Sequence, residues 1–234
     1  MAGKLGADPA LIALPFAKAR NRLGKYEEVI EDLQPTAYPL AMRADLWAEL
    51  GKARLGNNDP AGAEIAYAEA LKLVPHHEST MLNQAWGLMQ RGSYAEAAPL
   101  VADLLSRYPE NAEAWFLMAS VQQTQGEFEG ALAHYRQALQ LDPKHQRAAL
   151  GEAMALLGAG QSEQAAGLLQ QVLAADPGSL QAHYLYIRAL KELDRKDEAT
   201  VALRQASDLV STLAAEDLSN DSNQLLLAAT VTFE

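Results

Sequence analysis

Apolar residues recur along most of this chain at three- and four-residue spacing, the pattern of one buried face of an α-helix. Residues 112–145 show it most clearly, with one apolar face before Gly126 and another after it. Glycine suits a helix end that needs positive φ, and Pro143 cannot continue a helix. The apolar positions are Ala114, Trp115, Met118 and Ala119, then Phe128, Ala131, Leu132, Tyr135, Ala138 and Leu139. The pattern predicts a helix, a tight turn, a second helix and a turn.

Four prolines divide the chain at a constant interval. Pro75, Pro109, Pro143 and Pro177 follow one another at 34 residues, a period typical of stacked-repeat proteins. The regular spacing of prolines stops on both sides. The position 34 residues before Pro75 holds Ala41, and the position 34 residues after Pro177 holds Ser211. The prolines therefore bound the regular middle of a repeat array.

Residues 112–145 resemble a tetratricopeptide repeat, and the other units fill the same slots less completely. The matching residues are Trp115, Ala119, Gly126, Ala131, Tyr135, Ala138 and Pro143, and in residues 44–77 they are Trp47, Leu50, Gly51, Ala63, Tyr67, Ala70 and Pro75. The resemblance implies an all-α fold, a right-handed α-α superhelix of about six helix-turn-helix repeats. The expected array spans residues 9–213, with repeats at 10–43, 44–77, 78–111, 112–145, 146–179 and 180–213, of which the first is degenerate.

The last residues predict a further, incomplete repeat. Residues 216–224 read as a polar connector, and the apolar residues after it resemble the first helix of another unit: Leu225, Leu226, Leu227, Ala228, Ala229, Val231 and Phe233. We interpret residues 214–234 as a connector plus one helix, and the chain as a fragment of a longer array. An unpaired apolar helix would also allow self-association.

Composition narrows the function classes. The chain has 234 residues, a net charge of −11 and no cysteine. An acidic chain disfavours nucleic-acid partners, and no apolar run is long enough for a membrane span. No signal peptide is visible, so the compartment stays unknown.

The histidines offer little chemistry. His76, His77, His134, His145 and His183 form no metal-binding motif, so we expect no metal, no cofactor and no enzyme activity. We interpret His76 and His77 as a solvated turn. His183 holds the slot of Trp47 and Trp115, which predicts a packing role.

The family resemblance implies that the first helix of each repeat lines a concave groove where members bind peptides. The first-helix positions that would face this groove hold apolar residues in mid-array and basic residues towards each end, and these are the candidate contacts for a partner. They are Leu82, Trp86, Met89, Phe116, Leu150, Met154 and Tyr184, with Lys18, Arg22 and Lys52 at one end and Arg188 and Lys191 at the other. The alternative is that these residues pack against neighbouring helices. Trp86 is the sharpest case, because it lies outside the slot of Trp47 and Trp115.

The groove predicts a partner with apolar anchors and acidic flanks. It does not resemble the carboxylate clamp of chaperone-binding members, because Leu82 and Trp86 stand where Lys and Asn would be needed. Segments such as Leu23-Gly24-Lys25-Tyr26-Glu27-Glu28-Val29 are similar to the opening repeats of bacterial lipoproteins of the PEP-CTERM/exosortase and exopolysaccharide export systems.

We therefore expect a non-catalytic protein-interaction scaffold in a bacterial envelope or export-related assembly. The alternatives are the docking module of a longer enzyme or regulator, and a self-associating array.

Overall fold

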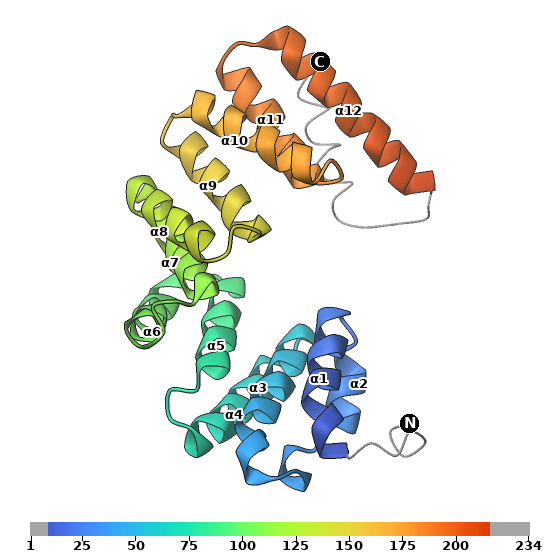
Figure 1. Ribbon diagram of the computed structural model, residues 1–234, viewed down its shortest axis with the longest axis vertical. Coiled ribbons are helices and arrows are strands. Elements are labelled where there is room, and N and C mark those ends of the chain that lie inside the picture. Colours follow the sequence, from blue (N-terminus) through green and yellow to red (C-terminus); the bar gives the residue numbers. More distant parts are fainter. Residues whose placement is uncertain (1–8, 216–234) are drawn as a thin grey trace. The chain divides into compact units, whose positions relative to one another are not determined.

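The computed structural model describes residues 9–215, and every regular element in that range is helical (Figure 1). The chain divides into two compact units at Glu110 and Asn111. Residues 216–234, where we predict a connector and a further helix, lie outside the described range.

The first unit is a succession of helix pairs joined by short turns. Each first helix also packs on the next first helix along the chain, α1 on α3 and α3 on α5. The elements are α1 (Pro9–Arg22), α2 (Tyr26–Asp32), a short 3-10 helix η2 (Pro35–Ala37), α3 (Leu40–Gly56), α4 (Pro60–Leu73), α5 (Glu78–Gln90) and α6 (Tyr94–Arg107).

The second unit repeats this scheme, with α7 packing on α9 and α9 on α11. Its elements are α7 (Ala112–Thr124), α8 (Phe128–Leu141), α9 (Gln146–Gly158), α10 (Ser162–Ala175), α11 (Leu180–Glu192) and α12 (Lys196–Ala215). The all-α class and the helix-turn-helix repeat are thus confirmed.

The turn inside each pair places one residue in the left-handed region of φ. That residue recurs at 34-residue intervals, as Gly24, Asn58, Gly92, Gly126, Gly160 and Asp194. Glycine, asparagine and aspartate tolerate positive φ best, which explains the choice of residue. In segment 44–77 the turn residue with positive φ is therefore Asn58, two residues after α3 ends at Gly56. Gly51 instead lies inside α3, where the Tyr67 ring leaves no room for a Cβ.

The prolines end the second helix of each pair. Pro75, Pro109, Pro143 and Pro177 each lie two residues beyond the last residue of α4, α6, α8 or α10. Ala41 and Ser211, in the same slots, lie inside α3 and α12. Those two helices have 17 and 20 residues, against 13 or 14 for α4 to α11. In α12, where Ser211 stands in place of the proline, the second helix extends through the slot. Ala41 is a different case, because α2 ends at Asp32 and Ala41 lies in the first turn of α3.

Small residues hold the pairs together. One alanine slot in the second helix is at most 1% exposed in five successive repeats: Ala63, Ala97, Ala131, Ala165 and Ala199. A residue this small lets the two helix backbones approach closely, so a larger side chain would force them apart.

Candidate functional site

Three first helices of the first unit, α1, α3 and α5, line one pocket of about 190 Å³. Its predicted residues are Lys18 and Arg22 from α1, Lys52 from α3 and Leu82 from α5. Lys18 and Lys52 are 34 residues apart, so consecutive repeats place two ammonium groups on one surface. Among the described residues, the ion pairs include none of these three cations.

Glu49 lines the same pocket and was not predicted from the sequence. Glu49 is only 7% exposed, and Asn21 Nδ2 donates to its Oε2 at 2.8 Å and to its backbone oxygen at 2.9 Å. The signal was an acidic residue in a slot that holds Leu117, Gly151 and Leu185 in the second unit; the slot holds Asn83 in the next repeat of the first unit, and Asn83 lines the same pocket. One buried carboxylate against three cations leaves the pocket positively charged.

Trp86 lies one helical turn after Leu82 on α5, and both side chains are half-buried. Met89, on the same helix, is only 7% exposed. Leu82 and Trp86 therefore remain accessible beside the basic pocket, whereas Met89 contributes to packing.

The predicted groove residues of the second unit are differently placed. Phe116 and Leu150 are buried, and the Arg147 guanidinium covers the Phe116 ring at 4.9 Å from its centroid. Arg188 pairs with Glu192 at 2.9 Å. Met154 and Tyr184 are half-buried, and Lys191 is exposed. The expectation that Phe116 and Leu150 contribute to an open apolar stripe therefore does not hold.

A charged cluster lies over Phe116 instead. Arg147 donates to both oxygens of Glu113, at 2.6 and 2.7 Å, and His145 Nε2 lies 3.0 Å from Oε2. Burial by itself would raise the pKa of Glu113, but the hydrogen bond from His145 and the adjacent Arg147 guanidinium together hold that pKa below its usual value. The cluster ties α7 to α9.

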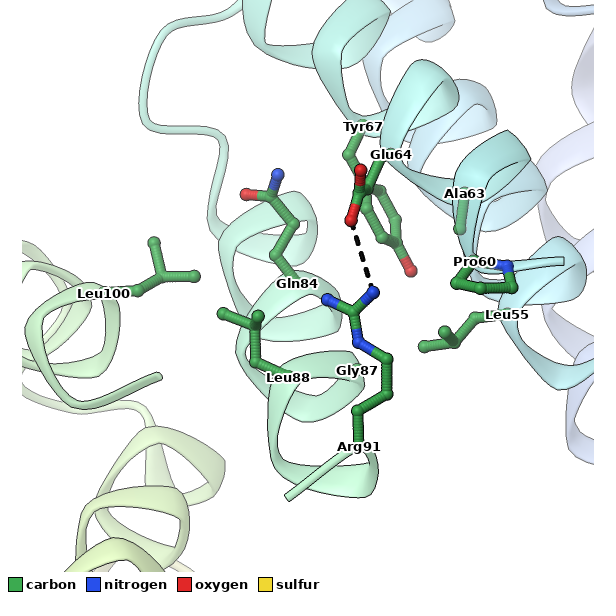
Figure 2. Close-up of a pocket in the computed structure, with 10 residues that line it drawn as sticks. All are labelled: Leu55, Pro60, Ala63, Glu64, Tyr67, Gln84, Gly87, Leu88, Arg91 and Leu100. Carbon is green, nitrogen blue, oxygen red and sulfur yellow. Dashed lines mark hydrogen bonds and ion pairs between the residues drawn. The ribbon is translucent and has the colours of Figure 1, made fainter. Parts of the chain in front are cut away.

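A second pocket, of about 370 Å³, opens where α3 and α4 meet α5 and α6. Figure 2 shows the Glu64–Arg91 pair, at 3.3 Å, across it, with Tyr67 on the α4 side. Leu55, Pro60, Ala63, Leu88 and Leu100 supply apolar walls.

Glu64 is one reason for this second pocket. It holds the slot that buried Leu132 fills in the second unit, and α4 packs on α5 much less closely than α8 packs on α9. This pocket was not predicted from the sequence, although the departure at Glu64 was visible there.

The histidines are structural in the described residues. His183 is 7% exposed with Nε2 at 3.0 Å from the Pro177 oxygen, so its packing role is confirmed. His76 is exposed, as expected of a solvated turn. His77 departs from that expectation, because its side chain is mostly buried and contacts Thr80 and Asp45.

Residues 9–215 contain neither a metal site nor a membrane span. No group of three or more His, Cys, Asp or Glu side chains in that range is arranged to hold a metal ion. Likewise, none of the helices described there has the length and apolar character to cross a membrane.

Comparison with known proteins identifies the repeats. Family models described as tetratricopeptide repeat match residues 82–149 and 156–212, together just over half of the chain. The chain belongs to the tetratricopeptide repeat family. Solved structures agree in fold. A crystal structure of MamA is 20% identical with a TM-score of 0.63, and the match covers 71% of this chain and 97% of that one.

Two further structures show the same superhelical repeat fold. TTC0263 of Thermus thermophilus, "a thermophilic TPR protein", is 17% identical with a TM-score of 0.63, covering 80% of this chain and 99% of that one. YrrB, "a TPR protein with an unusual peptide-binding site", is 19% identical with a TM-score of 0.60, covering 80% and 91%.

Two curated relatives are much longer proteins. The CTR9 homolog of Arabidopsis thaliana is 26% identical over 167 residues, which is 69% of this chain and 15% of the relative. The probable biofilm formation methyltransferase WspC of Pseudomonas putida is 33% identical over 91 residues, or 39% and 21%. The chain thus spans about a fifth or less of the length of these relatives.

Proposed function

We propose that this protein is a non-catalytic scaffold that binds a protein segment in the groove formed by α1, α3 and α5. The observation that carries the proposal is the convergence of Lys18, Arg22 and Lys52 with Leu82 on one pocket. Family membership supports it, and so does the similarity in fold to YrrB, a protein described as having an unusual peptide-binding site.

The chemistry of the groove defines the ligand. Lys18, Arg22 and Lys52 form no ion pair among the described residues, so they favour a ligand that carries carboxylates. The buried carboxylate of Glu49 would repel a ligand anion buried next to it. Half-buried Leu82 and Trp86 offer apolar contact one turn further along α5. The ligand is therefore an acidic segment with apolar anchors. Met154, Tyr184, Arg188 and Lys191 of the second unit stay predicted contacts for a partner.

A labelled peptide of alternating Asp and Leu tests this proposal by fluorescence anisotropy. We expect binding that weakens in Lys52→Gln and at higher salt, because the contact is between exposed charges. A Lys-Leu peptide controls for the charge of the ligand. Arg204→Gln is the matched protein control, since it removes one exposed positive charge from α12. Failure to bind the Asp-Leu peptide, or equal weakening by both substitutions, contradicts the proposal.

Trp86→Ala separates groove contact from packing. We expect weaker binding of the Asp-Leu peptide with little change in helical circular dichroism, because Trp86 is partly exposed on α5. A large fall in melting temperature would instead assign Trp86 to the core.

We propose, as a second candidate, that the array is the docking module of a longer enzyme or regulator. The similarity to part of a longer protein whose name includes methyltransferase supports this candidate. Sequencing the gene on both sides of the present residues tests it, and a complete gene coding only for repeats would contradict it.

The further proposal of a bacterial envelope or export-related assembly depends on the resemblance of the opening repeats to PEP-CTERM-system lipoproteins. Fractionation of the source cell tests this proposal. Recovery of the whole protein from the cytoplasm alone would contradict it.

A further inference from the structure

The pocket of about 370 Å³ between α4 and α5, which we call the α4–α5 pocket, lies where other repeats place an aromatic ring. Tyr26 and Phe128 begin α2 and α8, and their rings lie so close to Gly56 and Gly158 that a Cβ on either glycine would overlap them. Those glycines are the last residues of α3 and α9, the first helices of the following repeats. Pro60 begins α4 in the same slot, and it has no aromatic ring to place against α5.

Two more positions leave the α4–α5 pocket open. Glu64 is exposed, whereas Leu132 in the same slot of α8 is buried. Gly87 of α5 has no side chain in a slot that is filled in the second unit by Val121, Ala155 and Ala189. The pocket is therefore lined by three positions that carry less apolar volume than their counterparts elsewhere in the chain.

The missing ring does not open a pocket by itself. Ser162 begins α10 in the slot of Pro60, and yet α10 packs closely on α11. The Ser162 hydroxyl group donates to Glu192 of α11, and Ala166, in the slot of Glu64, is buried. The α4–α5 pocket thus depends on Pro60 and Glu64 together.

The Tyr67 hydroxyl group gives the α4–α5 pocket an unused polar contact. Tyr67 is 2% exposed, and its Oη has no hydrogen-bond partner. Figure 2 shows the Tyr67 ring on the α4 side, with the hydroxyl group directed into the space between Arg91 and Pro60. A buried hydroxyl group without a partner lowers the free energy of unfolding, and a ligand that forms a hydrogen bond with it removes that cost.

We propose that the α4–α5 pocket binds a small neutral molecule with a phenol-like ring, meaning an aromatic ring that carries an O–H or N–H group. The ring takes the place of the side chain missing at Pro60 and contacts the apolar walls formed by Leu55, Ala63 and Leu88. Its polar group forms a hydrogen bond with Tyr67 Oη, which can donate or accept. The volume of the pocket lies in the range of small-molecule sites.

The charges across the α4–α5 pocket favour a neutral ligand. Glu64 and Arg91 line it from α4 and α5 and pair with each other at 3.3 Å. Because each charge already has its counter-charge, neither an anion nor a cation gains a free partner there. The apolar walls and the Tyr67 hydroxyl group are the contacts that remain for a ligand.

Isothermal titration calorimetry with para-cresol tests the proposal. Toluene is the control ligand, because it has the same ring and methyl group without the hydroxyl. We expect wild type to bind para-cresol about fivefold more tightly than toluene, the effect of one net hydrogen bond. Tyr67→Phe should abolish that preference while it still binds toluene. An equal preference in wild type and Tyr67→Phe overturns the assignment of Tyr67 Oη.

A variant that restores the ring tests the location. Pro60→Phe should place its own ring in the α4–α5 pocket and abolish binding of para-cresol. Lys196→Phe is the matched control, because it adds a ring in the same slot at the start of α12, outside the pocket. Glu64→Leu, which restores the residue type of Leu132, should also weaken binding and serves if Pro60→Phe does not fold. Circular dichroism melts establish which variants fold.

The remaining outcomes decide between sources of the ring. The proposal is overturned if para-cresol does not bind wild type, or if Pro60→Phe and Lys196→Phe weaken binding equally. Tighter binding of the peptide Gly-Gly-Tyr-Gly-Gly than of para-cresol would also overturn it, and would assign the pocket to a tyrosine of a partner protein. Lys18→Gln should weaken binding of the Asp-Leu peptide and leave para-cresol unaffected, because Lys18 lines only the basic pocket. Failure of this proposal is therefore distinguishable from failure of the peptide groove.

Discussion

Two tyrosines, 68 residues apart, occupy the same slot of the second helix but differ in what their hydroxyl groups contact. Both are 2% exposed. Tyr135 Oη donates to Gln123 Oε1 at 2.8 Å and lies 3.2 Å from Ser120 Oγ. Tyr67 Oη is buried without a hydrogen-bond partner, because its equivalent neighbours are Leu55 and Lys52.

The substitution of each tyrosine by phenylalanine should therefore have opposite effects on the free energy of unfolding. Burying a hydroxyl group without a partner costs about 1–3 kcal/mol, whereas a satisfied hydrogen bond contributes about 1 kcal/mol net. We expect Tyr67→Phe to raise the free energy of unfolding by about 1 kcal/mol. We expect Tyr135→Phe to lower it by about the same amount.

Urea denaturation followed by circular dichroism and tryptophan fluorescence measures both values. Trp47 and Trp86 report on the first unit and Trp115 on the second, so a separate transition in each unit would be visible. Equal destabilisation by the two substitutions would refute the reasoning, because it would mean that Tyr67 Oη has a partner in solution.

Alkaline pH gives an independent measurement on Tyr67. Burial, and to a smaller extent the charge of Glu49, raises the pKa of Tyr67 in the folded protein. A tyrosine whose pKa is higher in the folded than in the unfolded protein contributes fully to the free energy of unfolding while the pH is below its unfolded pKa of about 10. That contribution is lost as the pH rises above the unfolded pKa. Tyr67→Phe should therefore lose less stability than wild type at alkaline pH. If wild type and Tyr67→Phe lose the same amount of stability at alkaline pH, ionisation of Tyr67 is not the cause of the loss.

Three further substitutions test the scaffold. Ala131→Leu should lower the free energy of unfolding by about 1–3 kcal/mol, because Ala131 is fully buried at a helix crossing; an unchanged melting temperature would contradict this. Glu113→Gln should weaken the dependence of melting temperature on pH below about 4.3, because the lowered pKa of Glu113 contributes stability that is lost as pH falls. Ser211→Pro should shorten α12 and reduce the helical circular dichroism signal; an equal signal would mean that the missing proline does not explain its length.

Much of the fold follows from the sequence because its determinants are local. Pro75, Pro109, Pro143 and Pro177 each lie two residues beyond a helix end, so they mark the turns correctly, whereas Pro15 and Pro99 lie inside α1 and α6. The alanine slot at 34-residue intervals likewise predicts the close crossings. The turn position of the second repeat was harder to predict, because Asn58 rather than a glycine adopts positive φ there.

The groove is less predictable because the accessibility of a first-helix residue depends on side chains from other repeats. Phe116 holds an inward slot, yet Arg147, 31 residues later, covers its ring. The position of Phe116 within its repeat does not show that the Arg147 side chain covers it. Lys18, Arg22 and Lys52 were easier to place, since long cations in inward slots of consecutive repeats point to one surface.

Departures from the repeat pattern suggest where this scaffold has been adapted. Stacked repeats are most stable when each slot holds the residue that packs best, so a residue that breaks the pattern without compensation points to another role. In the first unit, Glu49 puts a carboxylate in a slot that is apolar in the second unit, Glu64 stands where the next three repeats have Ala98, Leu132 and Ala166, and Tyr67 lacks the hydrogen-bond partners of Tyr135. Both pockets described above adjoin these residues. Residues 9–110 are therefore the part of the chain in which variants should change binding before they change the fold.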